Sequence, residues 1–490
     1  MNPTGHWLTK RASLTPNRLA LRFEEESWTF GELLDETNSM AKKLQSLQLV
    51  NKPVALLIQN TARAVILIHA LQKLGLTVVM LNPRLKIPEW HFQLADSEAQ
   101  LLIADDRFEL HTDLKDVIKV LTIDALEQLP LSTKAVQEYE RDTCSIMYTS
   151  GTTGQPKGVK QTYENHFTSA VGSALNIGLN PDDSWICAVP IFHISGYSIL
   201  MRSVIYGNNV TLYEKFDEKS VHQDLVQGNA TMISVVATML TRLLAVRGNE
   251  TYHERFRCML LGGGPAAGHV VQECFQAGIP VFQTYGMTET SSQFATLIPE
   301  DSRRKIGSSG KPLFLNEIKI IDSDHKKSGP NEIGEIAVKG PNVTTGYINR
   351  PSANREAFQD DWFYTGDIGY LDEEGFLFVL DRRSDLIISG GENIYPAEIE
   401  AVLSSHPSIE EAAVVGKKDS IWGEVPAAFV VQSTSGQIKK SALTEYCLDR
   451  LAGYKVPKTI YFMDKLPRNA SNKLLRRELK KKLEAEHEDH

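Results

Sequence analysis

The sequence is poor in cysteine, and its five cysteines are scattered. No two of them form a CxxC pair, which excludes a typical zinc site, and their number and spacing do not make a disulfide framework. Isolated thiols of this kind suit the reducing environment of the cytoplasm. The five positions are Cys144, Cys187, Cys258, Cys274 and Cys447.

Long apolar segments are also missing. The N-terminus, MNPTGHWLTKRASLTP, has no apolar core of the kind that a signal peptide requires. The most apolar long stretch, residues 64–81, is interrupted by His69, Gln72 and Lys73, so it reads as a buried helix followed by a strand. We therefore expect a soluble, cytoplasmic protein without a membrane span.

Positive charge is not in excess either. The chain has 52 lysines and arginines against 61 aspartates and glutamates, and its formal net charge is −9. This balance argues against a nucleic-acid binder, which would need a basic face. Basic residues concentrate only between residues 465 and 482, where a solvated helix face is the simpler interpretation and phosphate binding is the alternative.

The remaining composition is that of a globular protein. With 490 residues, 42% hydrophobic and 23% charged, two or three domains are expected, since a domain usually has about 100–200 residues. Short β-branched runs alternate with segments of helical period, which predicts βαβ units and mostly parallel sheets covered by helices. Predicted strands cover residues 54–58, 76–81, 184–189 and 258–262, and residues 62–74 form a predicted helix.

The pattern changes at about residue 316. EIKIID, GEIAVKG and GFLFVLD read as short strands of a β-rich piece, and a compact pattern of helices and strands follows residue 381. We expect an α/β fold with a large N-terminal domain, residues 1–381, a smaller α+β domain, residues 385–490, and a hinge at residues 382–384.

The strongest local signal is the segment Tyr148-Thr-Ser-Gly-Thr-Thr-Gly-Gln-Pro-Lys157-Gly-Val. Its glycines permit tight turns that aim backbone N–H groups inward, its hydroxyls add donors, and Lys157 adds a charge that can follow a phosphate. It is not a Walker A loop, because Gly-Lys-Ser/Thr is absent. The predicted nucleotide-binding residues of this loop are Thr149, Ser150, Gly151, Thr152, Thr153 and Lys157.

This segment resembles the phosphate loop of the adenylate-forming superfamily, which comprises acyl- and aryl-CoA ligases, peptide synthetase adenylation domains and luciferases. Four further motifs of the superfamily follow in order, so the resemblance covers essentially the whole chain. They are Tyr285-Gly-Met-Thr-Glu289, Tyr364-Thr-Gly-Asp367, residues 382–400 and Pro467-Arg-Asn-Ala-Ser-Asn-Lys473. The resemblance implies a ligase that adenylates a carboxylic acid with ATP and Mg²⁺ and then passes the acyl group to CoA. It also implies an N-terminal domain of two βαβ subdomains plus a small β-barrel, and a mobile C-terminal domain.

Each role that the resemblance implies suits its side chain. Asp367 can accept hydrogen bonds from both ribose hydroxyls, and Arg382 offers a fork of donors to the same sugar. Glu289 supplies an oxygen ligand for Mg²⁺ beside a catalytic Thr288. Lys473 is a compact charge for the acid and the α-phosphate. The resemblance also implies ATP or CoA contacts from Gly263, Gly264, Thr284, Tyr285, Gly390 and Gly391.

The turn Gly262-Gly-Gly264-Pro-Ala-Ala267 also fits the dinucleotide fingerprint G-x-G-x-x-A after a strand. However, Pro265 lies inside the turn, and no ribose-binding acid appears about 20 residues further on. The sequence therefore favours a loop that lies against adenine over a site for NAD.

His193 lies among apolar residues, where a structural role and a functional role are both open. In the superfamily a histidine at this place lies near the acyl carboxylate and gates the channel, and we favour that role. One position departs from the superfamily pattern, because Ser384 stands where the hinge residue is usually Asp or Lys. Its acidic neighbour Asp385 remains.

Residues 190–207, together with LLGGGPA and YGMTETSSQ, resemble the o-succinylbenzoate–CoA ligases of menaquinone biosynthesis. That acid has an aromatic ring and two carboxylates, and the carboxylate that is not activated needs polar partners in an otherwise apolar pocket. Residues that the resemblance suggests for substrate contact are Ser195, Arg202, Ser234 and Ser292. Arg202 could equally be a surface residue of a helix.

Other functions remain open at this point. The alternatives are a CoA ligase for another aryl or medium-chain fatty acid, an adenylation enzyme that loads a carrier protein, and a non-catalytic homologue. No carrier domain follows in the sequence, and Lys473, Glu289 and Asp367 are all present, which disfavours the last two. The expected partners are small molecules and not nucleic acid, and a homo-oligomer is neither indicated nor excluded.

Overall fold

A computed structural model describes most of the chain, in two compact units. The large unit contains residues 1–83, 94–148 and 158–380, and the small unit contains residues 84–93, 149–157 and 381–490. The described residues are 6–108, 114, 117–136, 138, 142–149, 156–263, 268–322, 326–382, 387–394, 396–433, 436, 438–467 and 476–488.

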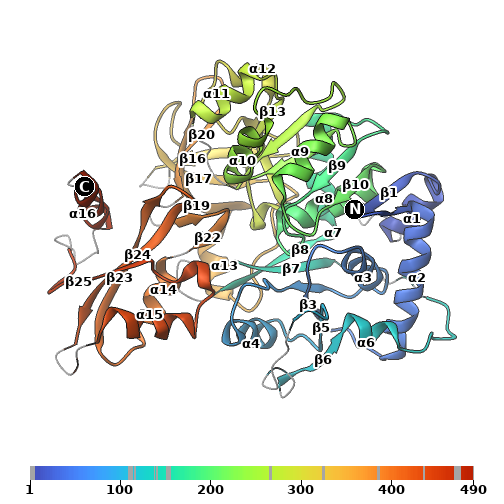
Figure 1. Cartoon of the computed structure of the whole chain (residues 1–490), viewed down its shortest axis with the longest axis horizontal. Coiled ribbons are helices and arrows are strands. Elements are labelled where there is room, and N and C mark those ends of the chain that lie inside the picture. The colour runs from blue at the N-terminus through green and yellow to red at the C-terminus, as the bar shows by residue number, and fades with distance from the viewer. Residues whose placement is uncertain are drawn as a thin grey trace. The chain divides into compact units, whose positions relative to one another are not determined.

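The large unit contains two large sheets whose central strands are parallel, whereas β14 and β2 of the larger sheet pair antiparallel with their neighbours (Figure 1). The order of the nine-stranded sheet is β15 (Lys311–Pro312), β14 (Ser292–Leu297), β13 (Val281–Met287), β12 (Cys258–Leu261), β11 (Met232–Val235), β9 (Ser184–Cys187), β10 (Asn209–Leu212), β1 (Leu19–Phe23), β2 (Glu26–Thr29). The order of the six-stranded sheet is β6 (Lys119–Thr122), β5 (Leu101–Ala104), β3 (Val54–Leu57), β4 (Val78–Met80), β7 (Thr143–Thr149), β8 (Lys157–Thr162). The predicted strands at 54–58, 76–81, 184–189 and 258–262 are confirmed as β3, β4, β9 and β12.

Helices cover both sheets, and α3 (Ala62–Lys73) is buried nearly all round. α3 packs on β4 and on β1, so it contacts both sheets, and almost all of its residues are buried. This confirms the buried helix predicted at 62–74. The helices of this unit are α1 (Trp7–Leu14), α2 (Phe30–Ser46), α3 (Ala62–Lys73), α6 (Ile123–Glu127), α7 (Tyr163–Ile177), α8 (Ile194–Tyr206), α9 (Glu218–Gln227), α10 (Ala237–Arg247), α11 (Gly268–Gln276), η1 (Thr288–Thr290), α12 (Pro299–Ser302) and α13 (Pro351–Ala357). α4 (Ile87–Asp96) begins in the small unit.

A third, antiparallel sheet forms the β-rich piece that the sequence predicts after residue 316. It packs its own apolar cluster, centred on Ile336, Val338 and Phe363, against Tyr285 and Phe294 of the nine-stranded sheet. Its strands are β16 (Glu317–Ile321), β17 (Gly334–Lys339), β18 (Phe358–Gln359), β19 (Trp362–Leu371) and β20 (Leu377–Arg382).

The small unit has one mixed sheet with an apolar cluster on each face. Val414 and Val430 point to one cluster with α14 and α15, and their neighbours Val415 and Phe429 point to the other with α16, as the two-residue period of a strand requires. The elements are β21 (Ile387–Ser389), β22 (Glu392–Ile394), α14 (Pro396–Ser404), β23 (Ile409–Asp419), β24 (Gly423–Gln432), α15 (Lys440–Leu448), η2 (Gly453–Lys455), β25 (Thr459–Phe462) and α16 (Arg476–Glu488).

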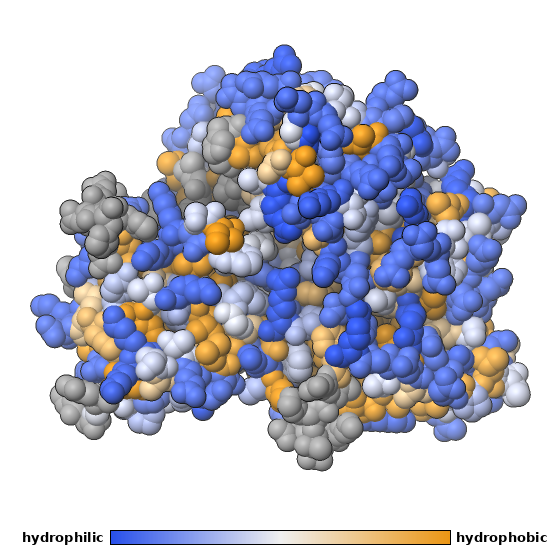
Figure 2. Space-filling view, in the orientation of Figure 1, coloured by the Kyte–Doolittle hydropathy of each residue, from blue (hydrophilic) through white to orange (hydrophobic). Residues whose placement is uncertain are grey.

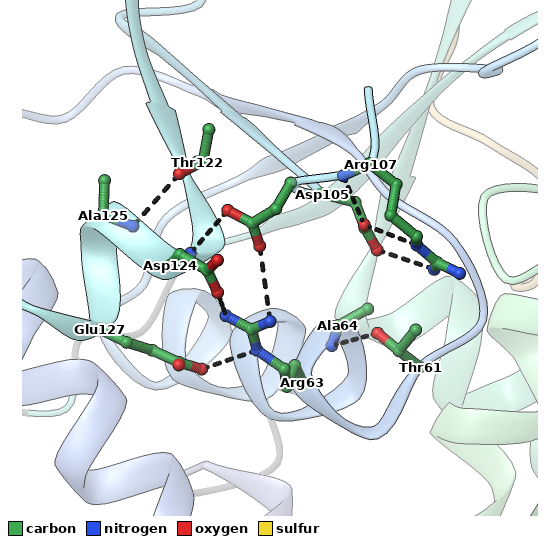
Figure 3. Close-up of polar contacts among 10 residues, drawn as sticks. Thr61, Arg63, Ala64, Asp105, Arg107, Thr122, Asp124, Ala125 and Glu127 are labelled. Carbon is green, nitrogen blue, oxygen red and sulfur yellow. Dashed lines mark hydrogen bonds and ion pairs between the residues drawn. The ribbon is translucent and has the colours of Figure 1, made fainter. Parts of the chain in front are cut away.

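Ion pairs join separate elements of the large unit (Figure 3). Arg63 of α3 binds Asp124 and Glu127 of α6 at 2.5 and 2.8 Å. Arg107, which follows β5, binds Asp105 at 2.9 Å and also Glu214, which follows β10. The contacts of Arg107 therefore connect the loop after β5 of the six-stranded sheet to the loop after β10 of the nine-stranded sheet.

The surface is that of an ordinary globular protein. Hydrophilic side chains cover much of the face seen in Figure 2, and apolar side chains form scattered groups. Within the described ranges, none of the helices has the length and apolar character needed to cross a membrane.

The N-terminal helix is held, through Thr9, by a partly buried ion pair. Lys73 of α3, which is 5% exposed, binds Glu138 at 2.9 Å. Partial burial alone would raise the pKa of Glu138, but hydrogen bonds from Thr9, from the backbone N–H of His6 and from Lys73 lower the pKa to about 2. A depressed carboxyl pKa stabilises the fold above its unfolded value near 4.5, and this stabilisation is lost as the pH falls toward 2.

Replacing this carboxylate tests the interaction. Glu138→Gln should cost about 1–2 kcal/mol at pH 7, discounted because the Glu138 side chain is 30% exposed. Thermal unfolding at a fixed scan rate should show a lower midpoint at pH 7 and a weaker pH dependence between 4.5 and 2 than the wild type. Glu25→Gln, at an exposed turn position, is the matched control. Equal midpoints for both variants at pH 7 would contradict the prediction.

Candidate active site

The carboxyl ends of four parallel strands gather many of the predicted site residues. β9, β11, β12 and β13 are neighbours with the same direction, so they all end at one edge of the nine-stranded sheet. Ligands of open α/β sheets bind at this edge. Ser234 lies near the end of β11, Gly263 follows β12, the Thr288–Glu289 turn follows β13, and His193 follows β9. We call this edge the candidate active site.

The His193 loop is tightly packed against the start of α8. The His193 backbone N–H donates to the carbonyl of Pro190 at 3.2 Å, and its ring lies 4.5 Å from that of Phe192. A Cβ at Gly196 would lie 2.4 Å from the Pro190 oxygen, so only glycine permits this approach. Ser195 is half-buried, and its carbonyl accepts a hydrogen bond from Ser198. The loop therefore places His193 in one backbone position.

The Thr288–Glu289 turn is held from three directions. Glu289 is 9% exposed, and its carboxylate accepts a hydrogen bond from Tyr347 at 3.1 Å. The Glu289 carbonyl accepts from the backbone N–H of Thr344 at 2.7 Å. The Thr288 carbonyl accepts from the Gln161 side chain at 2.9 Å. The turn therefore presents one carboxylate in a constrained position.

Two residues from separate predicted motifs meet beside this turn. The hydroxyl of Tyr285 on β13 donates to Asp367 on β19 at 2.8 Å, and Asp367 is 6% exposed. The backbone N–H of Asp367 donates to the Thr365 hydroxyl, which fixes the strand locally. Thr284 uses its hydroxyl to bind the carbonyl of Ala295 on β14 at 2.9 Å. The contact of Thr284 with nucleotide stays a prediction.

These groups fit MgATP. Mg²⁺ in nucleotide sites is held by one or two carboxylates together with substrate phosphates and water. The part of the chain that the structure describes contains no group of three side chains suited to hold a metal alone, whereas Glu289 offers a single buried carboxylate. Asp367 accepts from Tyr285, and a carboxylate has about four lone-pair sites, which is the chemistry that binds ribose hydroxyls.

Four buried residues and the half-buried Ser292 form what we call the Arg202 cluster: Trp185, Ser198, Arg202, Ser234 and Ser292. Arg202 Nη2 lies 3.4 Å from Ser292 Oγ, and the guanidinium lies 5.4 Å from the centre of the Trp185 ring. Ser292 Oγ also lies 3.3 Å from Ser198 Oγ. The Trp185 indole N–H donates to Ser234 Oγ at 3.1 Å. Three of the four predicted substrate residues are thus brought together.

Arg202 carries a buried charge that has no acidic partner among the residues that the structure describes. It is 2% exposed on α8, so its alternative interpretation as a surface residue is wrong. Burial lowers its pKa, its Nε has no hydrogen-bond partner, and no carboxylate among the described residues forms an ion pair with it. A buried charge is costly unless it is paired. The cluster is therefore suited to receive an anionic group.

Other predicted residues lie in or beside the small unit, or outside the described residues. Thr149 ends β7 and Lys157 begins the neighbouring β8, and both are half-buried. Gly390 and Gly391 have φ angles of +57° and +85°, and a Cβ at Gly390 would lie 2.7 Å from the Trp422 ring. Their conformation favours glycine whether or not CoA passes them. Outside the described residues lie Ser150, Gly151, Thr152, Thr153, Gly264, Ser384, Asp385, Lys473 and the Arg382 side chain.

The sequence reasoning missed Trp185, Ser198 and the buried polar residues behind the Thr288–Glu289 turn. Trp185 is fully buried in the middle of β9, where its aromatic ring reads as core. Its polar N–H was the available signal, because a buried indole usually finds an acceptor.

The chain matches the AMP-binding enzyme family over residues 8–348 and the AMP-binding enzyme C-terminal domain over residues 398–473. The chain belongs to the AMP-binding enzyme family. A 2-succinylbenzoate–CoA ligase of Geobacillus kaustophilus is 53% identical over 98% of both chains. The predicted superfamily and the α/β fold with a large N-terminal part and a small C-terminal part are thereby confirmed.

Solved structures of a second AMP-binding enzyme, the o-succinylbenzoate–CoA synthetase of Bacillus subtilis, are also similar. The form bound to the product analogue OSB-NCoA is 49% identical, with 97% of this chain and 98% of that chain covered and a TM-score of 0.94. At the same identity, the complex with the acyl-adenylate OSB-AMP has a TM-score of 0.77 (97% and 98% covered). The complex with ATP and a magnesium ion has a TM-score of 0.74 (97% and 99% covered).

Proposed function

We propose that this chain is an AMP-forming 2-succinylbenzoate–CoA ligase that acts in menaquinone biosynthesis. The single observation that carries the choice of acid is Arg202, a buried guanidinium without an acidic partner among the described residues. A dicarboxylate has one carboxylate that reacts and a second carboxylate that can pair with the Arg202 guanidinium. Monocarboxylates such as benzoate or octanoate would leave Arg202 unpaired.

The geometry supports a two-step reaction with ATP, Mg²⁺ and CoA. In the first step, a carboxylate oxygen of the acid attacks the α-phosphorus of ATP, and pyrophosphate leaves. Asp367 and Tyr285 would hold the ribose, and Glu289 would hold Mg²⁺, which would supply positive charge to the phosphates. In the second step, the CoA sulfur attacks the acyl carbon, and AMP leaves.

The remaining predicted roles complete this proposal. His193 lies in the loop after β9, where it can border the acyl channel, and Ser195 follows it. Lys473 acts on the α-phosphate in the first step, and Gly390 and Gly391 border the path of the pantetheine arm in the second. Residues 382–384 act as the hinge between a domain of residues 1–381 and one of residues 385–490. All five cysteines are buried free thiols, which suits a reaction in the reducing cytoplasm.

An acid panel tests the proposed substrate. AMP formation with CoA is measured for 2-succinylbenzoate and for two analogues that each lack one carboxylate, 2-butanoylbenzoate and 4-oxo-4-phenylbutanoate. Because each analogue lacks either the reacting group or the partner of Arg202, both should lose at least about 10²-fold in kcat/KM. Benzoate or octanoate turned over as efficiently as 2-succinylbenzoate would refute the acid assignment and leave the ligase class.

A further inference from the structure

A line of buried polar side chains runs behind the Thr288–Glu289 turn. His166 of α7 lies with Nε2 3.1 Å from Ser145 Oγ on β7. Ser145 Oγ lies 2.7 Å from Gln161 Oε1 on β8, and Gln161 Nε2 lies 2.9 Å from the Thr288 carbonyl. Ser145 and Gln161 are fully buried, and His166 is 2% exposed. We call His166, Ser145 and Gln161 the buried relay.

The hydrogen-bond direction along the buried relay follows from its last member. A backbone carbonyl only accepts, so Gln161 must turn its amide nitrogen to Thr288 and its oxygen to Ser145. The Ser145 hydroxyl therefore donates its one proton to Gln161. His166 Nε2 must then donate to Ser145, which fixes the Nε2–H tautomer.

The surroundings of His166 keep this tautomer neutral. Burial and the nearby charge of Arg202 lower the pKa of His166 to about 3. With its proton on Nε2, the ring leaves Nδ1 as an acceptor, and Nδ1 has no hydrogen-bond partner in the described part of the chain. The ring also packs on Tyr197 at 5.2 Å. His166 therefore donates one hydrogen bond, from Nε2 to Ser145, and Nδ1 makes none within the described residues.

We propose that His166 is a positioning residue for adenylation: through Ser145 and Gln161 it orients the Thr288 carbonyl and, with it, the turn that carries Glu289. This inference rests on the proposed role of that turn in binding MgATP. The Thr288 carbonyl also accepts from the backbone N–H of Ser291 at 3.2 Å, so Gln161 supplies its second, side-chain anchor. Partners behind a metal-binding group typically change activity by about 10–100-fold when removed.

Two substitutions at His166 distinguish the effect of its hydrogen-bond donor from the effect of its side-chain volume. In His166→Gln the amide Nε2 can replace the imidazole Nε2–H as donor to Ser145, whereas His166→Leu removes the donor. We expect His166→Leu to lower kcat/KM for ATP in pyrophosphate release by about 10–100-fold, and His166→Gln to retain activity within about threefold. Formation of the CoA ester from supplied acyl-adenylate should change little in either variant.

A matched control and a coupled variant guard against a general effect on folding. His222→Leu removes a buried histidine of α9 that is outside the buried relay and should leave kcat/KM for ATP unchanged. Gln161→Met should reproduce the loss, and the double variant His166→Leu with Gln161→Met should lose little more than either alone. Equal losses in His166→Gln and His166→Leu, or additive losses in the double variant, would overturn the proposal.

The same experiment distinguishes failure of this inference from failure of the proposed function. The variants are compared with whichever carboxylic acid the wild type activates, so a wrong acid does not affect the comparison. MgATP binding, measured by calorimetry without acid, should be weakened in His166→Leu and kept in His166→Gln. A wild type that releases pyrophosphate with no carboxylic acid would overturn both proposals.

Discussion

Arg202→Met is expected to lose about 10³-fold in kcat/KM for 2-succinylbenzoate while its thermal stability stays equal or rises. Removing one partner of a buried charge pair costs about 3–5 kcal/mol, and in the ligand complex the partner would be the second carboxylate. In the free protein the guanidinium is buried without an acidic partner among the described residues. Replacing a buried charge by an apolar side chain of similar volume is often neutral or stabilising. Gain in stability with loss of activity distinguishes a ligand-binding arginine from a structural one.

Arg257→Met is the matched control for this prediction. Arg257 is paired, since its Nε donates to the buried Asp183 at 2.8 Å and its Nη1 donates to the Ile177 carbonyl at 2.6 Å. That variant should lose stability and keep kcat/KM. Arg202→Met should also reduce the ratio of kcat/KM for 2-succinylbenzoate to kcat/KM for the analogue that keeps the reacting carboxylate. KM for ATP should stay unchanged. A lower melting temperature in Arg202→Met, with substrate preference unaltered, would make Arg202 structural.

Local sequence patterns were sufficient for the most apolar strands and for the buried helix that follows the first of them. The run VALLI and the apolar helix after it became β3 and α3, because a strand or helix buried on all sides shows a nearly continuous apolar run. Threonine caps mark helix starts in the same way, as in the capping box of Thr29 and Glu32 on α2. The motif glycine Gly286 has a packing cause as well, since a Cβ there would lie 1.8 Å from the Ser292 carbonyl.

Local sequence patterns could not predict the contacts between segments that are distant in the sequence. The sequence of α8 is hydrophobic on several sides, so it does not indicate whether Arg202 is buried. Arg202 is buried because α8 contacts α1, α7, β9 and β14. Trp185 and Ser234 join only because β9 and β11 are neighbours. The buried relay connects residues 145, 161 and 166 to residue 288, and no sequence period relates these positions.

Lys473→Ala is expected to slow pyrophosphate release by about 10²–10³-fold while largely sparing CoA-ester formation from supplied acyl-adenylate. Lys473 lies outside the described residues, so the prediction rests on the motif Pro467-Arg-Asn-Ala-Ser-Asn-Lys473 and on charge. Negative charge from the acid and the α-phosphate accumulates in the first transition state, and removing one positioned donor from such a site costs about 2.7–4 kcal/mol. In the second step the phosphoester is a leaving group already formed, so this lysine has less charge to stabilise.

The two half-reactions are measured separately to test this difference. Lys482→Ala is the matched control, because Lys482 is an exposed lysine of α16 in the same basic segment. It should leave both rates unchanged, which would also favour a solvated face for the basic residues of that helix. If Lys473→Ala slows both half-reactions equally at unchanged melting temperature, the lysine stabilises something common to both steps. In that case a single arrangement of the active site serves adenylation and thioester formation, and residues 382–384 are not required as a hinge between them.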